Sequence, residues 1–258
     1  TSKDKSKLFM LRFTTLSYDY DFTNKWFEKA SEVYKNVEKP NGRSNLVQLL
    51  TDMANYYASY KKEMSMQCIA DAFELQKAES EATLDDANIE LLDSLFRIFT
   101  QNHEAEKADA YVSDYLKCCL PQKDDSEEVS DGSEGIEDTV IIANLWMNYG
   151  KKWRKMEMHS FAAEYLFEAV TLLITECSKQ NCQNELKEAA IQLELLGDDL
   201  VTGTNFQEAK ETYIKVLTAK KYVTCGDGNQ ESTDQLLHKL STLCEKLLCS
   251  EEAQSYFS

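Results

Sequence analysis

The chain has 258 residues and carries 45 acidic against 28 basic side chains, a formal net charge of −17. Hydrophobic residues make up 43%, so the chain can bury a core, as one large domain or two small ones. A nucleic-acid-binding surface needs clustered Lys and Arg, and the acidic balance argues against one. Only 2 Pro and 8 Gly are present, too few for the many tight turns of a sheet-rich fold. The composition therefore favours long helices with short connections.

Apolar residues recur at intervals of three and four along most of the chain, which is the spacing of amphipathic helices. Asn24, Ser44, Thr204 and Ser250 stand where N-caps are expected, and Pro-Asn-Gly at 40–42 predicts a turn. Twelve helices with short links would form six antiparallel pairs. The predicted helices span residues 4–18, 22–38, 44–60, 63–79, 85–101, 103–119, 138–154, 158–178, 184–202, 205–220 and 232–248, with a last one starting near 250.

Residues 123–138 differ in composition, with eight acids, one base and almost nothing apolar. They predict an acidic disordered loop between helix pairs, after a helix that Pro121 ends. The loop is either a tolerated insertion or a regulatory segment. Regulation is suggested by Ser126, Ser130 and Ser133, which sit among acids as acidophilic-kinase sites do, and each phosphate would add about −1.5 to −2 charge.

Two glycines lie inside predicted helices, where each costs about 1 kcal/mol relative to Ala. Large residues flank each glycine at −4, −1 and +3, and a small residue follows twelve positions later. Small residues on facing helices let two backbones approach closely, while the large residues fill the sides. The packing residues expected from this pattern are Trp146, Tyr149, Gly150, Trp153 and Ala162 in one copy, and Leu193, Leu196, Gly197, Leu200, Ala209 and Tyr213 in the other.

This pattern resembles the tetratricopeptide repeat (TPR), whose signature is W-x2-L-G-x2-Y followed by Ala, Phe/Tyr and Ala. Weaker copies centre on Ala54, Phe96 and Ser241. The Ala54 copy leads to Met66, and the Ser241 copy leads to Ala253 and then Phe257. Most of the steps between copies, about 42–47 residues, exceed the common step of about 34 and indicate the long-helix variety of the family.

The resemblance implies an all-α fold, a right-handed α-solenoid of five to six TPR-like antiparallel helix pairs, forming a single domain over residues 1–258. A generic α-solenoid of the HEAT type is the alternative fold. Solenoids of helix pairs present an extended concave surface that binds peptides or helices of other proteins. By the same resemblance, the first helix of each pair lines this groove.

The expected groove residues are polar and mixed in charge. They include Asn55, Arg97, Asn144, Met147, Asn148, Lys151, Arg154, Lys155, Glu194 and Asp198, and the same helix offsets also place Ile191 and Leu195 there. Lys151, Lys152, Arg154 and Lys155 form a dense basic cluster. This cluster either offsets the dipole at a helix C-terminus or contacts an acidic peptide.

We therefore predict a non-catalytic protein–protein interaction scaffold or adaptor that holds a peptide or helix of another protein in its groove. The alternative is a structural strut of an obligate multi-subunit assembly, with lateral contacts and an idle groove. In either case the chain is expected to be a subunit of a larger complex. Because it lacks an initial Met, we expect a fragment of a longer protein.

Catalytic, cofactor and metal motifs are missing from the sequence. His103, His159 and His238 are isolated, the eight cysteines form no C-x-x-C pair, and no nucleotide-binding glycine motif occurs. We expect no enzyme activity, no cofactor and no metal. No run approaches the about 20 apolar residues of a membrane span. Most of the thiols are expected to be free, which together with the lack of N-glycosylation sequons favours a reducing compartment, cytoplasmic or nuclear.

Overall fold

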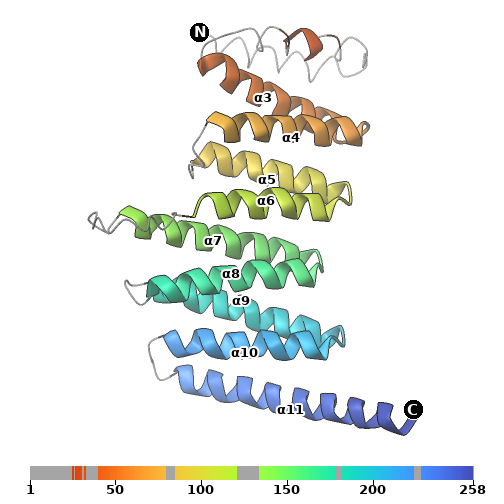
Figure 1. Ribbon diagram of the computed structural model, residues 1–258, viewed down its shortest axis with the longest axis vertical. Coiled ribbons are helices and arrows are strands. Elements are labelled where there is room, and N and C mark those ends of the chain that lie inside the picture. The colour runs from red at the N-terminus through yellow and green to blue at the C-terminus, as the bar shows by residue number, and fades with distance from the viewer. Residues whose placement is uncertain are drawn as a thin grey trace. The chain divides into compact units, whose positions relative to one another are not determined.

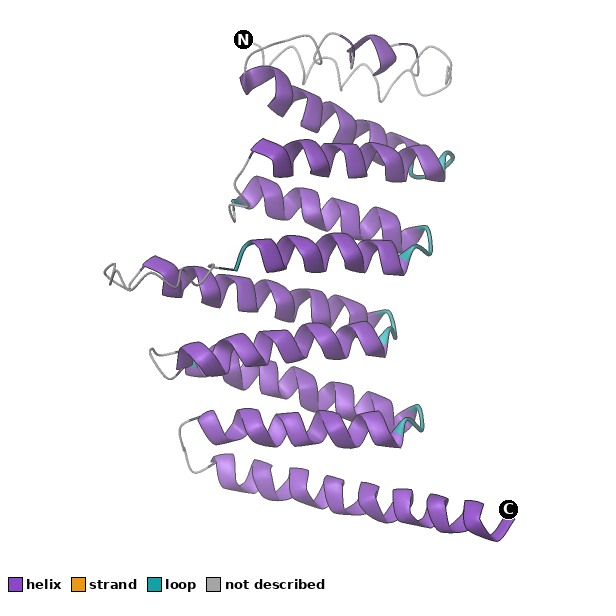
Figure 2. Cartoon of the chain, in the orientation of Figure 1, coloured by secondary structure: helices purple, strands orange, loops and turns teal. Residues whose placement is uncertain are grey.

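The computed structural model describes residues 25, 27–30, 32, 40–79, 85–120, 134–177, 182–223 and 228–257. For residues 40–43, 78–79, 134–137, 176–177, 228–231 and 248–257, only the backbone is described. These parts of the chain form helices and turns without strands, and neighbouring helices pack in series (Figures 1 and 2). The all-α prediction is confirmed. The predicted helix 4–18, the cap Asn24 and the three candidate phosphorylation sites lie outside the described residues.

The chain divides into two compact units, residues 1–115 and residues 116–258. The bounds of helices α3 to α10 agree with the predicted helices to within four residues at each end. The first unit holds α3 (Pro40–Tyr57), α4 (Lys62–Glu79), α5 (Asp86–Gln101) and all but the last turn of α6 (Ala105–Cys118). The second holds α7 (Glu134–Lys155), α8 (His159–Cys177), α9 (Gln183–Thr202), α10 (Phe206–Tyr222) and α11 (Gly228–Phe257).

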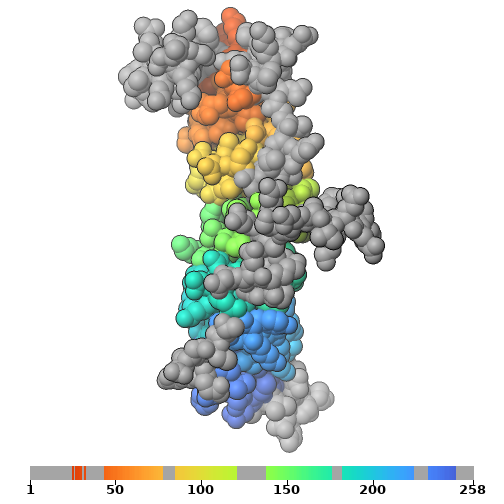
Figure 3. Space-filling model, turned by 90° about the vertical axis from the view of Figure 1, so that its left-hand side faces the viewer, coloured from red at the N-terminus to blue at the C-terminus, as the bar shows by residue number. Residues whose placement is uncertain are grey.

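Within the second unit the helices form two layers. Besides α8, α7 contacts α9, and α8 contacts α10 as well as α7 and α9, so odd- and even-numbered helices alternate between the layers (Figure 1). Each helix buries an apolar stripe against its neighbours, and side chains fill the space between successive helices of the unit (Figure 3). Four helix pairs, α3/α4, α5/α6, α7/α8 and α9/α10, thus lie within the described residues.

The two helical glycines mark close approaches between paired helices. A Cβ atom on Gly150 would lie 2.8 Å from Cγ and 3.3 Å from the backbone nitrogen of Leu166 on α8. A Cβ atom on Gly197 would lie 2.7 Å from Cδ1 of the Tyr213 ring on α10. Real Cβ atoms essentially never come within 3.0 Å of another atom, so a larger residue at either site would force Leu166 or Tyr213 to shift. All eleven expected packing residues, from Trp146 to Tyr213, are buried.

We expect Gly197→Ala to lower the free energy of unfolding by about 1–2 kcal/mol, because overpacking outweighs the gain in helix propensity. Gly203→Ala is the matched control. There the new Cβ would meet its nearest neighbour, the Asp199 carbonyl oxygen, at 3.6 Å, an ordinary contact. Urea unfolding of both variants measures the difference. Equal stability of the two variants would contradict the close approach.

Three turns within helix pairs share one backbone geometry. His103, Glu157 and Thr204 each have a left-handed φ, at 63°, 61° and 65°. In the α7–α8 turn, the N–H of Met158 donates to the Trp153 carbonyl at 3.1 Å. The α5–α6 and α9–α10 turns repeat this bond at the equivalent residues. The left-handed position normally favours glycine, so these turns carry strain that the packing of each pair offsets.

Thr204→Gly should raise the free energy of unfolding by about 1 kcal/mol, because a β-branched residue is strained at positive φ. The same substitution at Thr218, an exposed position within α10, should lower it by about 0.5 kcal/mol through reduced helix propensity. Thermal unfolding followed by circular dichroism measures both. A loss of stability at both positions would rule out strain at Thr204.

The α3–α4 turn is shorter, and this corrects the predicted register of the first copy. The N–H of Lys61 donates directly to the Tyr57 carbonyl at 2.8 Å, and no left-handed residue intervenes. Ser65, and not Met66, therefore takes the place held by Ala162 in the α7/α8 pair. Ser65 is fully buried, and its hydroxyl donates to the Ala54 carbonyl at 2.6 Å.

Several predicted helix ends are wrong. The expected turn at 40–42 is the first turn of α3, because Pro lacks only an N–H that the first helical turn leaves unpaired. Ser44 therefore lies inside α3. The last residues of the predicted acidic loop, 134–138, begin α7. The residue that caps α10 is Asn205 and not Thr204.

The largest difference concerns the C-terminal end. The predicted helices 232–248 and from 250 onward are one continuous helix, α11, so Ser250 caps nothing. No Gly or Pro occurs between residues 244 and 253, and nothing in the local sequence breaks the helix. The Ser241 copy therefore lacks the separate second helix that the repeat pattern predicts.

Candidate functional site

The α9 helix exposes two apolar side chains on the side away from its core. Ile191 is 42% and Leu195 38% exposed. At 3.6 residues per turn they lie opposite the stripe that buries Leu193, Leu196 and Leu200. These two residues form the centre of what we call the α9 face, the outward side of α9 together with the adjoining sides of α7 and α11.

On the α7 side, two cations connect the helices. Arg154 Nε lies 2.7 Å from Asp199 Oδ2, and Arg154 Nη1 donates to Gln192 Oε1 at 2.9 Å. Lys151 Nζ lies 3.0 Å from Glu188 Oε1. These hydrogen bonds and ion pairs join the first helices of two successive pairs.

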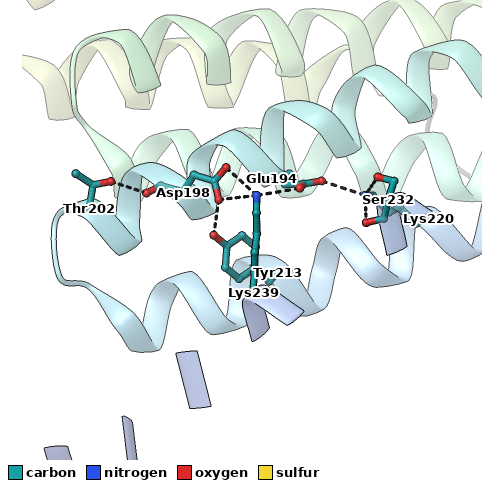
Figure 4. Close-up of polar contacts among 7 residues, drawn as sticks. All are labelled: Glu194, Asp198, Thr202, Tyr213, Lys220, Ser232 and Lys239. Carbon is teal, nitrogen blue, oxygen red and sulfur yellow. Dashed lines mark hydrogen bonds and ion pairs between the residues drawn. The ribbon is translucent and has the colours of Figure 1, made fainter. Parts of the chain in front are cut away.

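On the α11 side, Lys239 connects the helices. Its ammonium donates to Glu194 Oε1 at 3.0 Å and to the two Asp198 oxygens at 2.8 and 2.9 Å (Figure 4). Burial disfavours the charge of Lys239, but the bonds to Asp198 and Glu194 together outweigh it and raise the pKa of the ammonium. Lys239 therefore stays charged and holds α11 against α9.

The same two carboxylates also bind α10. Lys220, almost completely buried, donates to Glu194 Oε2 at 3.0 Å (Figure 4). The hydroxyl of Tyr213 donates to Asp198 Oδ1 at 2.6 Å. Burial, reinforced by this hydrogen bond and the charge of Asp198, raises the pKa of Tyr213, so the phenol keeps its proton.

The charges around the α9 face are therefore engaged within the protein. Hydrogen bonds from Lys151 and Gln192 lower the pKa of Glu188 and keep it ionised. Gly150 and Gly197 occupy equivalent positions in successive helix pairs. Asn148 and Leu195 each lie two residues before one of these glycines, so Asn148 of α7 lies at the same level as Leu195 of α9. The face thus presents an apolar centre and the exposed amide of Asn148, with a rim of paired charges.

The first unit contains a related contact. Arg97 of α5 donates to Asn55 Oδ1 of α3 at 2.5 Å. Both were expected to line the groove, and here too a polar contact connects the first helices of successive pairs. Most of the expected groove residues thus bind one another or their helix neighbours.

The remaining expected residues differ in exposure. Asn148 and Lys155 are exposed and Asn144 is half-buried. Met147 is only 5% exposed, so its assignment to the groove is wrong; it belongs to the core because its side of α7 turns toward α9. Lys152 lies over the Tyr149 ring, 4.4 Å from its centroid. Of the predicted basic cluster, Lys155 alone has no such contact among the described residues.

Sequence reasoning missed Tyr165 of α8. Its ring lies 4.8 Å from that of Trp146, 6.3 Å from Tyr149 and 6.4 Å from Trp153, centroid to centroid. In the sequence, Tyr165 directly precedes Leu166 and is not one of the positions of the repeat pattern. Only its aromatic character indicated that it belongs to the core.

Metal-binding and membrane-spanning features do not occur in the described parts of the chain. There, no group of three or more His, Cys, Asp or Glu side chains lies close enough to hold a metal ion. Nor does any described helix have the length and apolar character to cross a membrane. Cys68, Cys118, Cys119 and Cys244 are free, whereas Cys182 is disulfide-bonded.

No family model matches the chain, and no curated protein matches it. The TPR resemblance therefore stays a prediction, carried by the packing pattern around Gly150 and Gly197. The single continuous solenoid over both units stays a prediction as well.

Glu194→Gln should lower the free energy of unfolding by about 2 kcal/mol, since it leaves the buried Lys220 ammonium without its carboxylate. It should also speed amide hydrogen exchange in the first half of α11, where Lys239 loses one partner. Glu164→Gln, at an exposed position of α8, is the control and should change neither quantity. Unchanged exchange in α11 would show that the ion pair between Glu194 and Lys239 contributes nothing to holding α11.

Proposed function

We propose that the chain is a non-catalytic protein-interaction module whose helix pairs form a TPR-like solenoid. The α9 face binds a peptide or helix of another protein, in the cytoplasm or nucleus. The observation that supports this proposal is the pair Ile191 and Leu195, two large apolar side chains left exposed side by side on a helix face. On α7, Ile141 is also exposed, seven residues before Asn148 and thus on the same side of that helix.

The contacts around the pair define the ligand's chemistry. Arg154, Lys151 and Lys239 already have carboxylate partners, and breaking those pairs would cost the free energy they supply. The ligand therefore binds through apolar anchor side chains, with Asn148 available to hydrogen-bond its backbone. Charge on the ligand affects mainly how fast it arrives, because the net charge of the chain is strongly negative.

A displayed library of random peptides tests the proposal even though the natural partner is unidentified. Peptides selected on the wild-type protein should lose affinity about 10- to 100-fold for Leu195→Asp, the loss expected when one apolar anchor contact disappears. Ile214→Asp is the matched control, because Ile214 is 47% exposed on α10 in the other helix layer. Both substitutions leave the ion pairs intact, which Lys151→Glu would not.

Selected peptides that bind Leu195→Asp as well as wild type would overturn the proposal, as would failure to select any. A strut with lateral contacts and an idle groove is the second candidate, favoured by exposed Ile214 and Tyr222 on α10. In that case Ile214→Asp would be the substitution that weakens assembly, and Leu195→Asp would have no effect.

A further inference from the structure

The helix α11 leaves uncovered a face that the preceding copies of the repeat bury. In α9, Leu193, Leu196 and Leu200 stand at −4, −1 and +3 from Gly197, and all three are buried beneath α10. The same offsets from Ser241 give Leu237, Leu240 and Cys244. Leu237 is 49% exposed, and Leu240 and Cys244 are half-buried. This side of α11, which we call the 237–244 row, can therefore pack against a second helix.

The preceding copies show what such a helix looks like. The Phe96, Gly150 and Gly197 copies each offer a small residue twelve positions after the central one and a larger residue four positions later, as Ala209 and Tyr213 do after Gly197. The sequence repeats this spacing after Ser241, with Ala253 followed by Phe257. The complementary segment thus exists in this chain.

That segment cannot cover its own chain's face, because it continues the same helix. Twelve residues of α-helix separate positions 241 and 253 by about 18 Å along the axis. At 30 residues, α11 is far longer than α10, which has 17, and its C-terminal end projects past the α9–α10 turn (Figure 1). In Figure 1 no other helix of the described chain lies beside this projecting part.

We propose that a second copy of the chain supplies the missing helix. Two α11 helices pair antiparallel, and the C-terminal half of each lies on the 237–244 row of the other. Pairing position 241 with position 253 of the partner puts the two-fold axis close to residue 247. Each copy thereby completes the other's last helix pair, which is a reciprocal exchange of identical elements. A second copy is favoured over an unrelated helix because the required small and large residues occur in α11 itself at the spacing of the other copies.

Cysteine cross-linking tests the exchange directly. In Ser241→Cys/Ala253→Cys, mild oxidation with copper-phenanthroline should give a covalent dimer of about twice 29.6 kDa on a non-reducing gel. The bridge must form between chains, since a disulfide joins Cα atoms no more than about 7 Å apart. The control, Ser241→Cys/Ser255→Cys, moves the second thiol to the opposite side of the helix. Wild type and the single variants show any background from native thiols.

Sedimentation velocity of the unmodified wild-type chain at micromolar concentration is the second measurement, with a dimer expected. Preferential dimer cross-linking in the 241/253 variant, together with a wild-type dimer, supports the exchange. A wild-type monomer overturns it. So does an intrachain bridge, which would show that α11 folds back on itself, and so does equal cross-linking in the 241/255 control.

Discussion

The close approach of paired helices at Gly150 and Gly197 is the constraint on which the second unit depends. With no side chain at these positions, Leu166 and Tyr213 pack directly against the facing backbone and set the register of each pair. The shared turn geometry then places the second helix of each pair at the same level relative to the first helix. Because both pairs have the same register, α7 and α9 align, and Arg154 meets Asp199 although 45 positions separate them. The same alignment leaves Ile191 and Leu195 facing outward.

Much of this arrangement was predictable from local patterns. Apolar spacing located α3 to α10, because each helix buries one stripe whatever its neighbours are. Gly150 and Gly197 revealed the close approaches, since a glycine within a helix needs a compensating contact. The groove offsets selected the outward side of α9, although the sequence said nothing of the pairing between Lys239, Glu194 and Asp198. Those pairs depend on how far each helix is rotated against the next.

Other features could not be predicted from the sequence because they depend on single residues or on competing structures. One residue fewer in the α3–α4 turn moved Ser65 into the place expected for Met66, and turn length is not encoded in the apolar pattern. The continuous α11 was missed because a repeat pattern does not by itself break a helix; a turn needs its own residues. Met147 was assigned to the groove because the helix offsets taken from a family do not account for how α7 is rotated about its own axis. That rotation buries the side of α7 that carries Met147. Because the charged side chains around the α9 face pair with one another, this face is also more apolar than its composition suggested.

Size complementarity across each helix pair is the most specific consequence of the constraint. Glycine stands opposite Leu166 and Tyr213, whereas Phe96 stands in a copy whose equivalent residue is the smaller Val112. A double-mutant cycle between Gly197→Ala and Tyr213→Val tests this most directly by urea unfolding. If the two positions share one space, Gly197→Ala should destabilise the wild type but cost little in a chain that already carries Tyr213→Val, with a coupling free energy of about 1–2 kcal/mol. Additive effects of the two substitutions would contradict the account.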